Sequence, residues 1–388
     1  MLFKNARLIL PDRIQPAGAL RVRDGCIAQI SAPGETLAAE PGEAVLDANG
    51  KFLAPGFVDM HIHGALRRDS MEASPEAFSQ ICQFHASGGT TALALTTVSA
   101  PQSEIVAVLK AAGSIDPNAT GGARIVGIHI EGPYFSKEKP GAHLPDLLRH
   151  PNPAEYSEWL QYRDRITQVT LAPELPGALA CIEALCAAGI RVSGGHSDAW
   201  DEDAAAGFAH GMRQATHTFN CMSGARRRGP YRVAGLLEFA MGEPEMLCEL
   251  IADGHHVSPT LMRALYRAKG PDGIALVTDA GGGAGLAVGE SFMVGCIKAV
   301  VHDGISLTED GSALACSVAR MNELVRTMVE KVDVPLQEAV RMASLNPAKA
   351  LGLDHTLGSL QSGLKADLVL LNDDLGVEMT FLEGQRVF

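Results

Sequence analysis

The chain has 388 residues, of which 46% are hydrophobic and 20% charged, so it can bury a large core and is not intrinsically disordered. Its net charge of −13 argues against a general binder of nucleic acids or of anionic membranes. No run of about 18 apolar residues occurs, and the first residues lack the apolar stretch of an export signal. Eight scattered cysteines without a CxxC pair predict reduced thiols. We therefore expect a cytoplasmic protein without a membrane span.

Short strand patterns occupy the first fifty residues. We expect strands at 4–10, 19–23 and 26–30, the last two joined by the turn dipeptide Asp24-Gly25. Short strand patterns occur again near the C-terminus, at 366–371, 377–381 and 386–388. Both ends of the chain, residues 1–53 and 349–388, are therefore expected to form one small β-sandwich domain.

Between these ends, apolar strand patterns alternate with helical patterns. The helical patterns at 75–87 and 178–188 are each followed by glycine, which commonly ends a helix. Eight such alternations predict an α/β fold, a (β/α)8 TIM-type barrel over residues 54–348, rather than an open sheet. The expected barrel strands are 57–63, 90–97, 124–131, 166–173, 190–196, 213–218, 247–252 and 274–279.

Two histidines end the first barrel strand, in the motif Phe57-Val58-Asp59-Met60-His61-Ile62-His63-Gly64. Because side chains alternate along a strand, His61 and His63 face the same side and could grip one divalent metal. A pair of hydrogen-bonded core histidines produces the same pattern, so this motif alone leaves both interpretations open.

Four further strands end in residues that ligate metals or carry protons. Glu131 ends the third strand, His196 the fifth, His217 the sixth and Asp279 the eighth. The C-terminal face of a barrel gathers such strand ends in space. Each residue has an ordinary alternative, such as a helix-cap partner or a turn residue. One shared metal site accounts for all of them together.

This order of strand-end residues resembles the amidohydrolase superfamily. Narrower motifs resemble the deacetylase families that act on N-acetylglucosamine 6-phosphate and N-acetylgalactosamine 6-phosphate, and the resemblance covers nearly the whole chain. These motifs are Glu131-Gly132-Pro133-Tyr134-Phe135, Lys139-Pro140-Gly141-Ala142-His143, Gly195-His196-Ser197, Thr216-His217-Thr218-Phe219-Asn220-Cys221-Met222, Ala252-Asp253-Gly254-His255-His256-Val257 and the closing segment 358–369.

The resemblance implies how the metal is held. Glu131, His196 and His217 would bind the principal metal, and His61 with His63 would complete a second site that Glu131 bridges. Many amidohydrolases use a carboxylated lysine on strand 4 as the bridge, but residues 167–173 contain no lysine. One or two divalent ions are expected per subunit. Zinc is the expected metal, with iron, cobalt and manganese as alternatives.

The resemblance also implies the reaction. Asp279 would take a proton from metal-activated water and later deliver it to the leaving amine, while His143 would help to polarise the acetyl carbonyl. The expected substrate is N-acetylglucosamine 6-phosphate, cleaved to glucosamine 6-phosphate and acetate.

Sugar and phosphate contacts are inferred by position. Arg228, donated from the second subunit of a homodimer, and His256 would bind the phosphate. In the families the arginine lies in His-His-Arg-Glu-Pro-Gly, whereas this chain has Arg226-Arg227-Arg228-Gly229-Pro230-Tyr231. A second departure is Cys316, where Leu-Ala-Gly-Ser is usual, and a third is the glycine run 281–283. The remaining sugar contacts would be Ala142, Asn220, Cys221, Leu314, Ala315 and Cys316.

Three alternatives stay open on sequence grounds. The substrate could be the galactosamine epimer, because one hydroxyl configuration is distinguished by loop detail. The chain could be another amidohydrolase, such as an N-acyl-amino-acid deacylase. It could also be a catalytically inactive scaffold, although every metal and proton-transfer residue is present. No nucleic-acid or membrane partner is expected.

Overall fold

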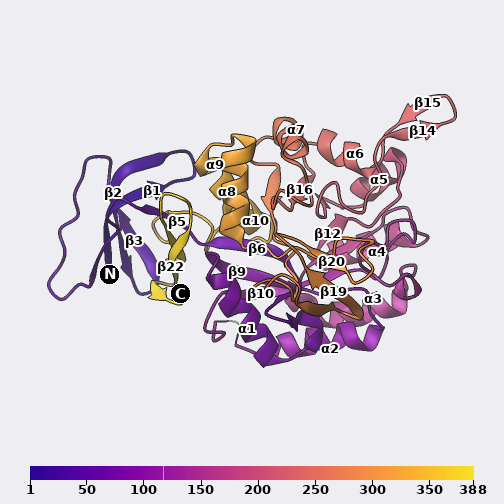
Figure 1. The fold of residues 1–388 in the computed structure, drawn as a ribbon, viewed down its shortest axis with the longest axis horizontal. Coiled ribbons are helices and arrows are strands. Elements are labelled where there is room, and N and C mark those ends of the chain that lie inside the picture. The colour runs from indigo at the N-terminus through magenta and orange to yellow at the C-terminus, as the bar shows by residue number, and fades with distance from the viewer. Residues whose placement is uncertain (117) are drawn as a thin grey trace.

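The computed structural model describes residues 1–116 and 118–388. Within them, eight parallel strands form a nearly closed barrel in which each strand pairs with its neighbour in chain order (Figure 1). The predicted barrel is confirmed. Its strands are β6 (Phe57–Ile62), β9 (Thr90–Thr96), β10 (Arg124–Glu131), β11 (Ile166–Leu171), β12 (Arg191–Gly194), β13 (Gln214–Ala215), β16 (Leu247–Leu250) and β17 (Ile274–Leu276).

The barrel closes between its first and last strands through the residues that follow β17. The backbone N–H of Asp279 donates to the carbonyl of His61 at 3.0 Å, and the N–H of His63 donates to the carbonyl of Ala280 at 2.8 Å. The hydroxyl of Thr278 also donates to the buried carboxylate of Asp59. This closure brings the two ends of the barrel segment together at its C-terminal face.

Helices cover the outside of the barrel and bury their apolar faces against its strands (Figure 1). The first begins where expected, because Ser74 Oγ accepts a hydrogen bond from the N–H of Ala77 and Pro75 occupies the first turn. The helices are α1 (Pro75–Ala86), α2 (Gln102–Ala112), α3 (Pro153–Trp159), α4 (Ala178–Ala187), α5 (Asp201–Ala209), α6 (Leu236–Gly242), α7 (Pro259–Lys269), α8 (Met321–Val332), α9 (Leu336–Ala343) and α10 (Leu345–Ala350), with short 3-10 turns at Ser70–Glu72, Pro145–Leu147 and Leu160–Arg165.

A second sheet combines both ends of the chain, as predicted. Figure 1 shows the two termini beside each other, next to the barrel. The Phe3 and Phe381 rings meet edge to face with centroids 5.1 Å apart in the core of this sheet. The boundaries 1–53, 54–348 and 349–388 stay a prediction. Its strands are β1 (Leu2–Ile9), β2 (Ile14–Arg23), β3 (Cys26–Ile30), β4 (Val45–Asp47), β5 (Phe52–Pro55), β21 (Leu368–Leu371), β22 (Val377–Leu382) and β23 (Gln385–Arg386).

Three small β-units were not expected from the sequence. β7 (Gly64–Ala65) pairs with β8 (Arg68–Asp69) directly after the H-x-H strand. β14 (Arg226–Arg228) and β15 (Tyr231–Val233) form a hairpin that projects from the barrel, at the upper right of Figure 1. β18 (Ser291–Val294), β19 (Ile297–Val301) and β20 (Ser306–Thr308) form a three-stranded sheet after the last barrel strand. None of the described helices combines the length and apolar character that a bilayer span requires.

Candidate active site

The predicted strand-end residues meet at the C-terminal face of the barrel. A cavity of about 210 Å³ opens there. Although far apart in the sequence, six of the predicted metal and catalytic side chains line it: His63, Glu131, His143, His196, His217 and Asp279. His61 is fully buried behind this wall, in contact with Glu131 and Asp279.

Three of these residues have left-handed backbones. His196, His217 and Asp279 take φ values of 48°, 30° and 48° directly after their strands. Non-glycine residues pay about 1–2 kcal/mol for this conformation, so surrounding bonds have to hold it in place. At Asp279 the backbone N–H donates to His61, and its carbonyl accepts from the N–H of Ser317 at 2.8 Å. The turn ends each strand early and swings the side chain into the cavity.

Glu131 lies at the centre of the cluster, with its two carboxylate oxygens facing different partners. Oε1 is 3.2 Å from Nε2 of His217 and 3.4 Å from Nε2 of His196. Oε2 is 3.2 Å from Nε2 of His63. Oε1 is also 3.5 Å from Nε2 of His61, so the carboxylate contacts both histidines of the H-x-H pair and those that follow β12 and β13.

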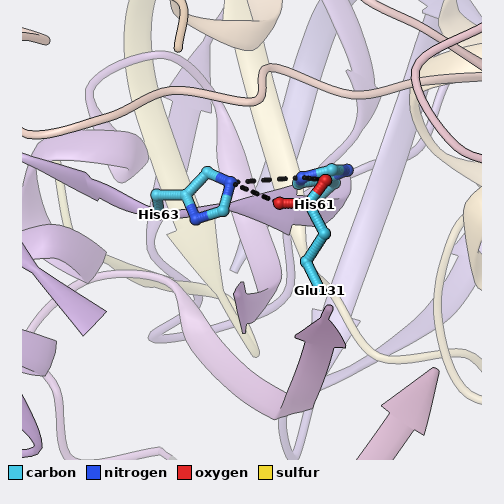
Figure 2. Close-up of side chains that lie close together, drawn as sticks. All are labelled: His61, His63 and Glu131. Atoms are coloured by element: carbon cyan, nitrogen blue, oxygen red, sulfur yellow. Dashed lines mark hydrogen bonds and ion pairs between the residues drawn. The ribbon is translucent and has the colours of Figure 1, made fainter. Parts of the chain in front are cut away.

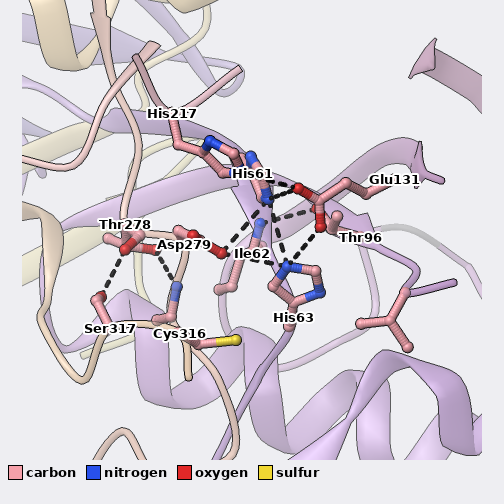
Figure 3. Close-up of polar contacts among 12 residues, drawn as sticks. His61, Ile62, His63, Thr96, Glu131, His217, Thr278, Asp279, Cys316 and Ser317 are labelled. Carbon is pink, nitrogen blue, oxygen red and sulfur yellow. Dashed lines mark hydrogen bonds and ion pairs between the residues drawn. The ribbon is translucent and has the colours of Figure 1, made fainter. Parts of the chain in front are cut away.

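The H-x-H pair converges as the alternation of side chains requires. Nε2 of His61 lies 3.3 Å from Nε2 of His63, and both face Glu131 (Figure 2). Asp279 Oδ1 is 3.2 Å from His63 Nε2 and 3.4 Å from His61 Nε2, as Figure 3 shows from another side. The two histidines are therefore not an ordinary core pair, because two buried carboxylates face the same ring nitrogens.

The donor set fits a divalent cation. Nε2 atoms also face one another at 3.1 Å in the pair His196 and His217. Four imidazole nitrogens and two carboxylates point into one buried space, and groups of three have their ligand atoms within 4.8 Å of one another. Neutral imidazole and carboxylate are ligands that zinc and its neighbours in the first transition row accept.

Charge in the cluster is balanced between histidines and carboxylates. Burial lowers the pKa of His63, but hydrogen bonds to Asp279 and Glu131 outweigh it and raise this pKa to about 9. For His196, burial is likewise outweighed, chiefly by Cys221 and Glu131, and the pKa rises to about 10. Burial favours neutral carboxyls, yet the adjacent histidines hold the pKa values of Glu131 and Asp279 far below their ordinary range. Both carboxyls are therefore ionised at neutral pH.

His143 has the opposite character. Burial lowers its pKa to about 4, so the ring is neutral at pH 7. Its Nδ1 accepts a hydrogen bond from the backbone N–H of Ser99 at 3.1 Å. The single ring proton therefore resides on Nε2, which faces the cavity 3.6 Å from Glu131 Oε2. A neutral ring with a proton on this atom is a hydrogen-bond donor for a substrate oxygen.

Glu249 is part of the site and was missed from the sequence. Its fully buried carboxylate lies 3.1 Å from Nδ1 of His61 and accepts a hydrogen bond from the backbone N–H of His217 at 3.2 Å. Gln168 and Gln214 donate to its other oxygen at 3.1 and 2.6 Å. An acceptor at Nδ1 places the ring proton of His61 there and leaves Nε2 free. The one available signal was a lone carboxylate in the apolar strand pattern 247–252.

Most predicted sugar and phosphate contacts line the same cavity. The side chain of His256 is 5% exposed and lines the cavity wall, with Nδ1 2.6 Å from Asp253 Oδ2. Burial opposes its charge, but this contact raises the pKa of His256 above the ordinary value. Ala315 is buried beside the cavity without lining it. The predicted contacts that do line it are Ala142, Asn220, Cys221, His256, Leu314 and Cys316.

Arg228 does not reach the cavity of its own chain. It lies on the projecting hairpin, where its guanidinium pairs with Glu202 at 2.6 Å and packs 4.0 Å from the ring centroid of Trp200. Arg226 packs on the same ring at the same distance and contacts Asp198. The arginine cluster is therefore ordered on the outside of the barrel rather than beside the metal cluster.

Comparison with known proteins places these features in context. The chain is 36% identical to an N-acetylglucosamine-6-phosphate deacetylase of Vibrio furnissii, over 87% of this chain and 83% of that protein. It is 35% identical to an N-acetylgalactosamine-6-phosphate deacetylase of Escherichia coli O157:H7, over 94% of this chain and 93% of that protein.

A solved structure shares the fold over the whole chain. It is a mutant N-acetyl-D-glucosamine-6-phosphate deacetylase of Mycobacterium smegmatis in complex with N-acetyl-D-glucosamine-6-phosphate. The TM-score is 0.90 at 30% identity, over 100% of this chain and 99% of the other. The model of the amidohydrolase family matches residues 52–387. By its barrel, its strand-end residues and these matches, the chain belongs to the amidohydrolase family.

Proposed function

We propose that this enzyme removes the acetyl group of N-acetylglucosamine 6-phosphate by metal-dependent hydrolysis, releasing acetate and glucosamine 6-phosphate. The observation that carries the proposal is the cavity in which Glu131, four histidines and Asp279 converge. The similarity to relatives of that name supports the choice of substrate. A sugar phosphate is charged and does not cross a bilayer unaided, so the proposal also places the enzyme in the cytoplasm.

Members of the amidohydrolase family generally bind a divalent metal. We assign His196, His217 and Glu131 to the principal ion, and His61 and His63, with Glu131 shared, to a second ion. The contacts of Glu131 with both sets of histidines support this shared role. When bound, a zinc ion lowers the pKa of a coordinated water and polarises the substrate carbonyl.

Asp279 carries the proton in this proposal. Its carboxylate is ionised, lines the cavity and can accept the proton of the attacking water. The same group then protonates the nitrogen of the substrate, because an amine leaves far more readily than an amide anion. One residue thus serves first as base and then as acid.

His143 stabilises the charge that develops on the acetyl oxygen. Its Nε2 proton faces the cavity, and the backbone N–H of Ser99 fixes the ring orientation. A donor already in place needs no reorganisation as the tetrahedral oxyanion forms.

The 6-phosphate is held by His256 and by Arg228 of a second subunit. His256 is charged more readily than an ordinary histidine because Asp253 contacts it. A phosphate needs charge-assisted donors, and arginine provides two in one plane. Because Arg228 projects away from its own cavity, a homodimer in which each hairpin reaches the partner's site would supply this cation.

The galactosamine epimer is the second candidate substrate, favoured by the 35% identity to the deacetylase that carries that name. A panel of N-acetylglucosamine and N-acetylgalactosamine, each with and without 6-phosphate, tests the proposal through released acetate. Fastest turnover of N-acetylglucosamine 6-phosphate is expected. Preference for the galactosamine compound, or for N-acyl amino acids included in the same panel, would overturn the substrate assignment.

A further inference from the structure

The thiol of Cys316 lies in the metal cluster, next to two residues that face the H-x-H pair. His63, Asp279 and Cys316 each offer a ligand atom within 4.8 Å of the other two. Cys316 lines the cavity, and Figure 3 shows its side chain beside those of Asp279 and His63. Donors around one tetrahedral zinc ion lie roughly 3.5 Å apart, so a small side-chain movement brings all three to one ion. We propose that Cys316 binds the metal at His63 as a thiolate ligand.

The backbone around Cys316 is fixed against the strand end that carries Asp279. The N–H of Ser317 donates to the carbonyl of Asp279 at 2.8 Å, and the N–H of Gly281 donates to the carbonyl of Ser317 at 3.1 Å. The hydroxyl of Ser306 donates to the carbonyl of Cys316 at 2.9 Å. The backbone that carries the thiol is therefore tied to the same strand end that closes the barrel.

Two further features show that the chain accommodates a side chain at this position. Cys316 has a φ of 61°, a conformation in which glycine is favoured, so a cysteine carries a conformational cost there. A Cβ at Gly281 would lie 2.8 Å from the Cys316 Cβ and 3.1 Å from its sulfur. The first glycine of the run 281–283 thus makes room for the cysteine side chain.

The surroundings of Cys316 disfavour a free thiolate that could act as a nucleophile without a metal. Burial, and then the charges of Asp279, Asp69 and Glu131, raise the pKa of the Cys316 thiol well above its ordinary value. Only a nearby cation reverses this, because a metal–sulfur bond forms as the thiol proton leaves to solvent. A soft thiolate also favours zinc over manganese or magnesium, which narrows the choice of metal.

X-ray absorption of the zinc-loaded enzyme tests the ligand directly. A zinc–sulfur shell at about 2.3 Å is expected beside the nitrogen and oxygen shell at about 2.0–2.1 Å. The shell is expected to vanish in Cys316→Ser and in Cys316→Gly, the second of which suits the left-handed backbone and secures a folded variant. Cys221→Ser is the matched control, because Cys221 lines the same cavity beside His196 instead.

Metal affinity gives a second measurement. Competition with a chelator is expected to show the Kd for zinc rising about tenfold or more in Cys316→Ser, and the Kd for manganese changing less. No sulfur shell in the parent enzyme, a shell that persists in Cys316→Ser, or its loss only in Cys221→Ser would each overturn the inference.

The inference rests on the proposed function only for the metal site. Acetate release is therefore measured on the same samples. Turnover of the sugar phosphate without a sulfur shell would refute the thiolate ligand and leave the proposed function standing. A sulfur shell without turnover of any substrate in the panel would support the thiolate ligand and refute the proposed function.

Discussion

At the scale of single residues, the site depends on side chains whose protonation states are set by their neighbours. His63 and His196 share a buried space with Glu131 and Asp279, and the histidines are the groups that carry protons there. A neutral donor, His143, faces the same space. The surroundings of each side chain therefore decide which histidines and carboxylates act as base, as hydrogen-bond donor or as metal ligand.

Asp279→Asn tests the proton carrier. An amide cannot accept and return a proton, so turnover should fall by roughly 10²- to 10⁴-fold while zinc remains bound. Acetate release and metal content are measured on the same preparation. Turnover near the parent value would contradict the assignment of Asp279.

Glu249→Gln tests the support behind His61. The amide keeps the size of the side chain but weakens the acceptor at His61 Nδ1, so zinc affinity should fall by about 10- to 100-fold. Glu245→Gln, an exposed carboxylate just before the same strand, is the control. Equal chelator resistance in both variants would show that Glu249 only fills the barrel interior.

Metal binding should release protons. The pKa values of His63 and His196, about 9 and about 10 without metal, keep both rings protonated at pH 7, and a metal displaces those protons. Zinc affinity should therefore rise as pH increases from 7 towards 9. Calorimetry in buffers of different ionisation enthalpy counts the protons. More than two are expected per subunit loaded at both sites at pH 7, because the pKa of His61 is raised as well and a Cys316 thiolate releases its own proton. Zero proton release would contradict these raised pKa values.

At the scale of elements, the β14–β15 hairpin is the feature that a single chain does not explain. Its cations pack on Trp200 and point away from the cavity. Under the proposed function, the tip of the hairpin would meet the cavity of a second subunit. Its strands pair from Arg226 with Val233 to Arg228 with Tyr231, so the arginine sits next to the turn.

Mixing two inactive variants tests that role. Arg228→Ala should raise KM for the phosphorylated sugar by about 10- to 100-fold and leave zinc content unchanged, because it removes a charge-assisted donor. Combined with Asp279→Asn subunits, it should regain activity at low substrate, since one hybrid site has both groups intact. Confirmed subunit exchange without any gain would show that Arg228 acts elsewhere.

The same scale shows what sequence patterns can and cannot predict. Strand β10 was predicted with its observed bounds because, despite register shifts within it, it stays paired with β11 up to Glu131. The strands before His196, His217 and Asp279 end earlier than predicted, because left-handed turns break the ladder and the residues that take this conformation are not glycines. Strand alternation and the barrel rule were enough to bring together the strand-end residues, whereas His143 and the sugar contacts were predicted from the family resemblance. The role of Glu249 was not predicted, because its partners Gln168 and Gln214 come from other strands and the contacts are not visible in the sequence.

At the scale of the whole molecule, a buried ion pair ties the terminal sheet to the barrel. Arg124, at the start of β10, donates to Asp367 next to β21 and to Glu383 at 2.8 Å. The side chains of Arg124 and Asp367 are 9% and 2% exposed. Asp367 also accepts from the backbone N–H of Glu383 at 2.9 Å, so it keeps one hydrogen bond but loses its opposite charge if Arg124 is removed.

Arg124→Ala should therefore lower the free energy of unfolding by about 3–5 kcal/mol, because it leaves a buried carboxylate unpaired. Chemical denaturation measures this change. Arg163→Ala, which breaks only the exposed pair with Asp164, should stay within about 0.5 kcal/mol of the parent chain. Equal values for both variants would mean that the terminal sheet is held by apolar packing alone.

The junction that closes the barrel also sets an order of events during synthesis. Asp59 and Thr278 meet there although 219 residues separate them. A ribosome adds roughly 5–20 residues per second, so on the order of 10–40 s pass between their appearances. The emerging polypeptide presents its histidines to cellular metals long before Asp279 exists. The chain therefore gains its hydrolytic activity in one late step. A chain truncated before the last barrel strand is expected to be inactive rather than partly active.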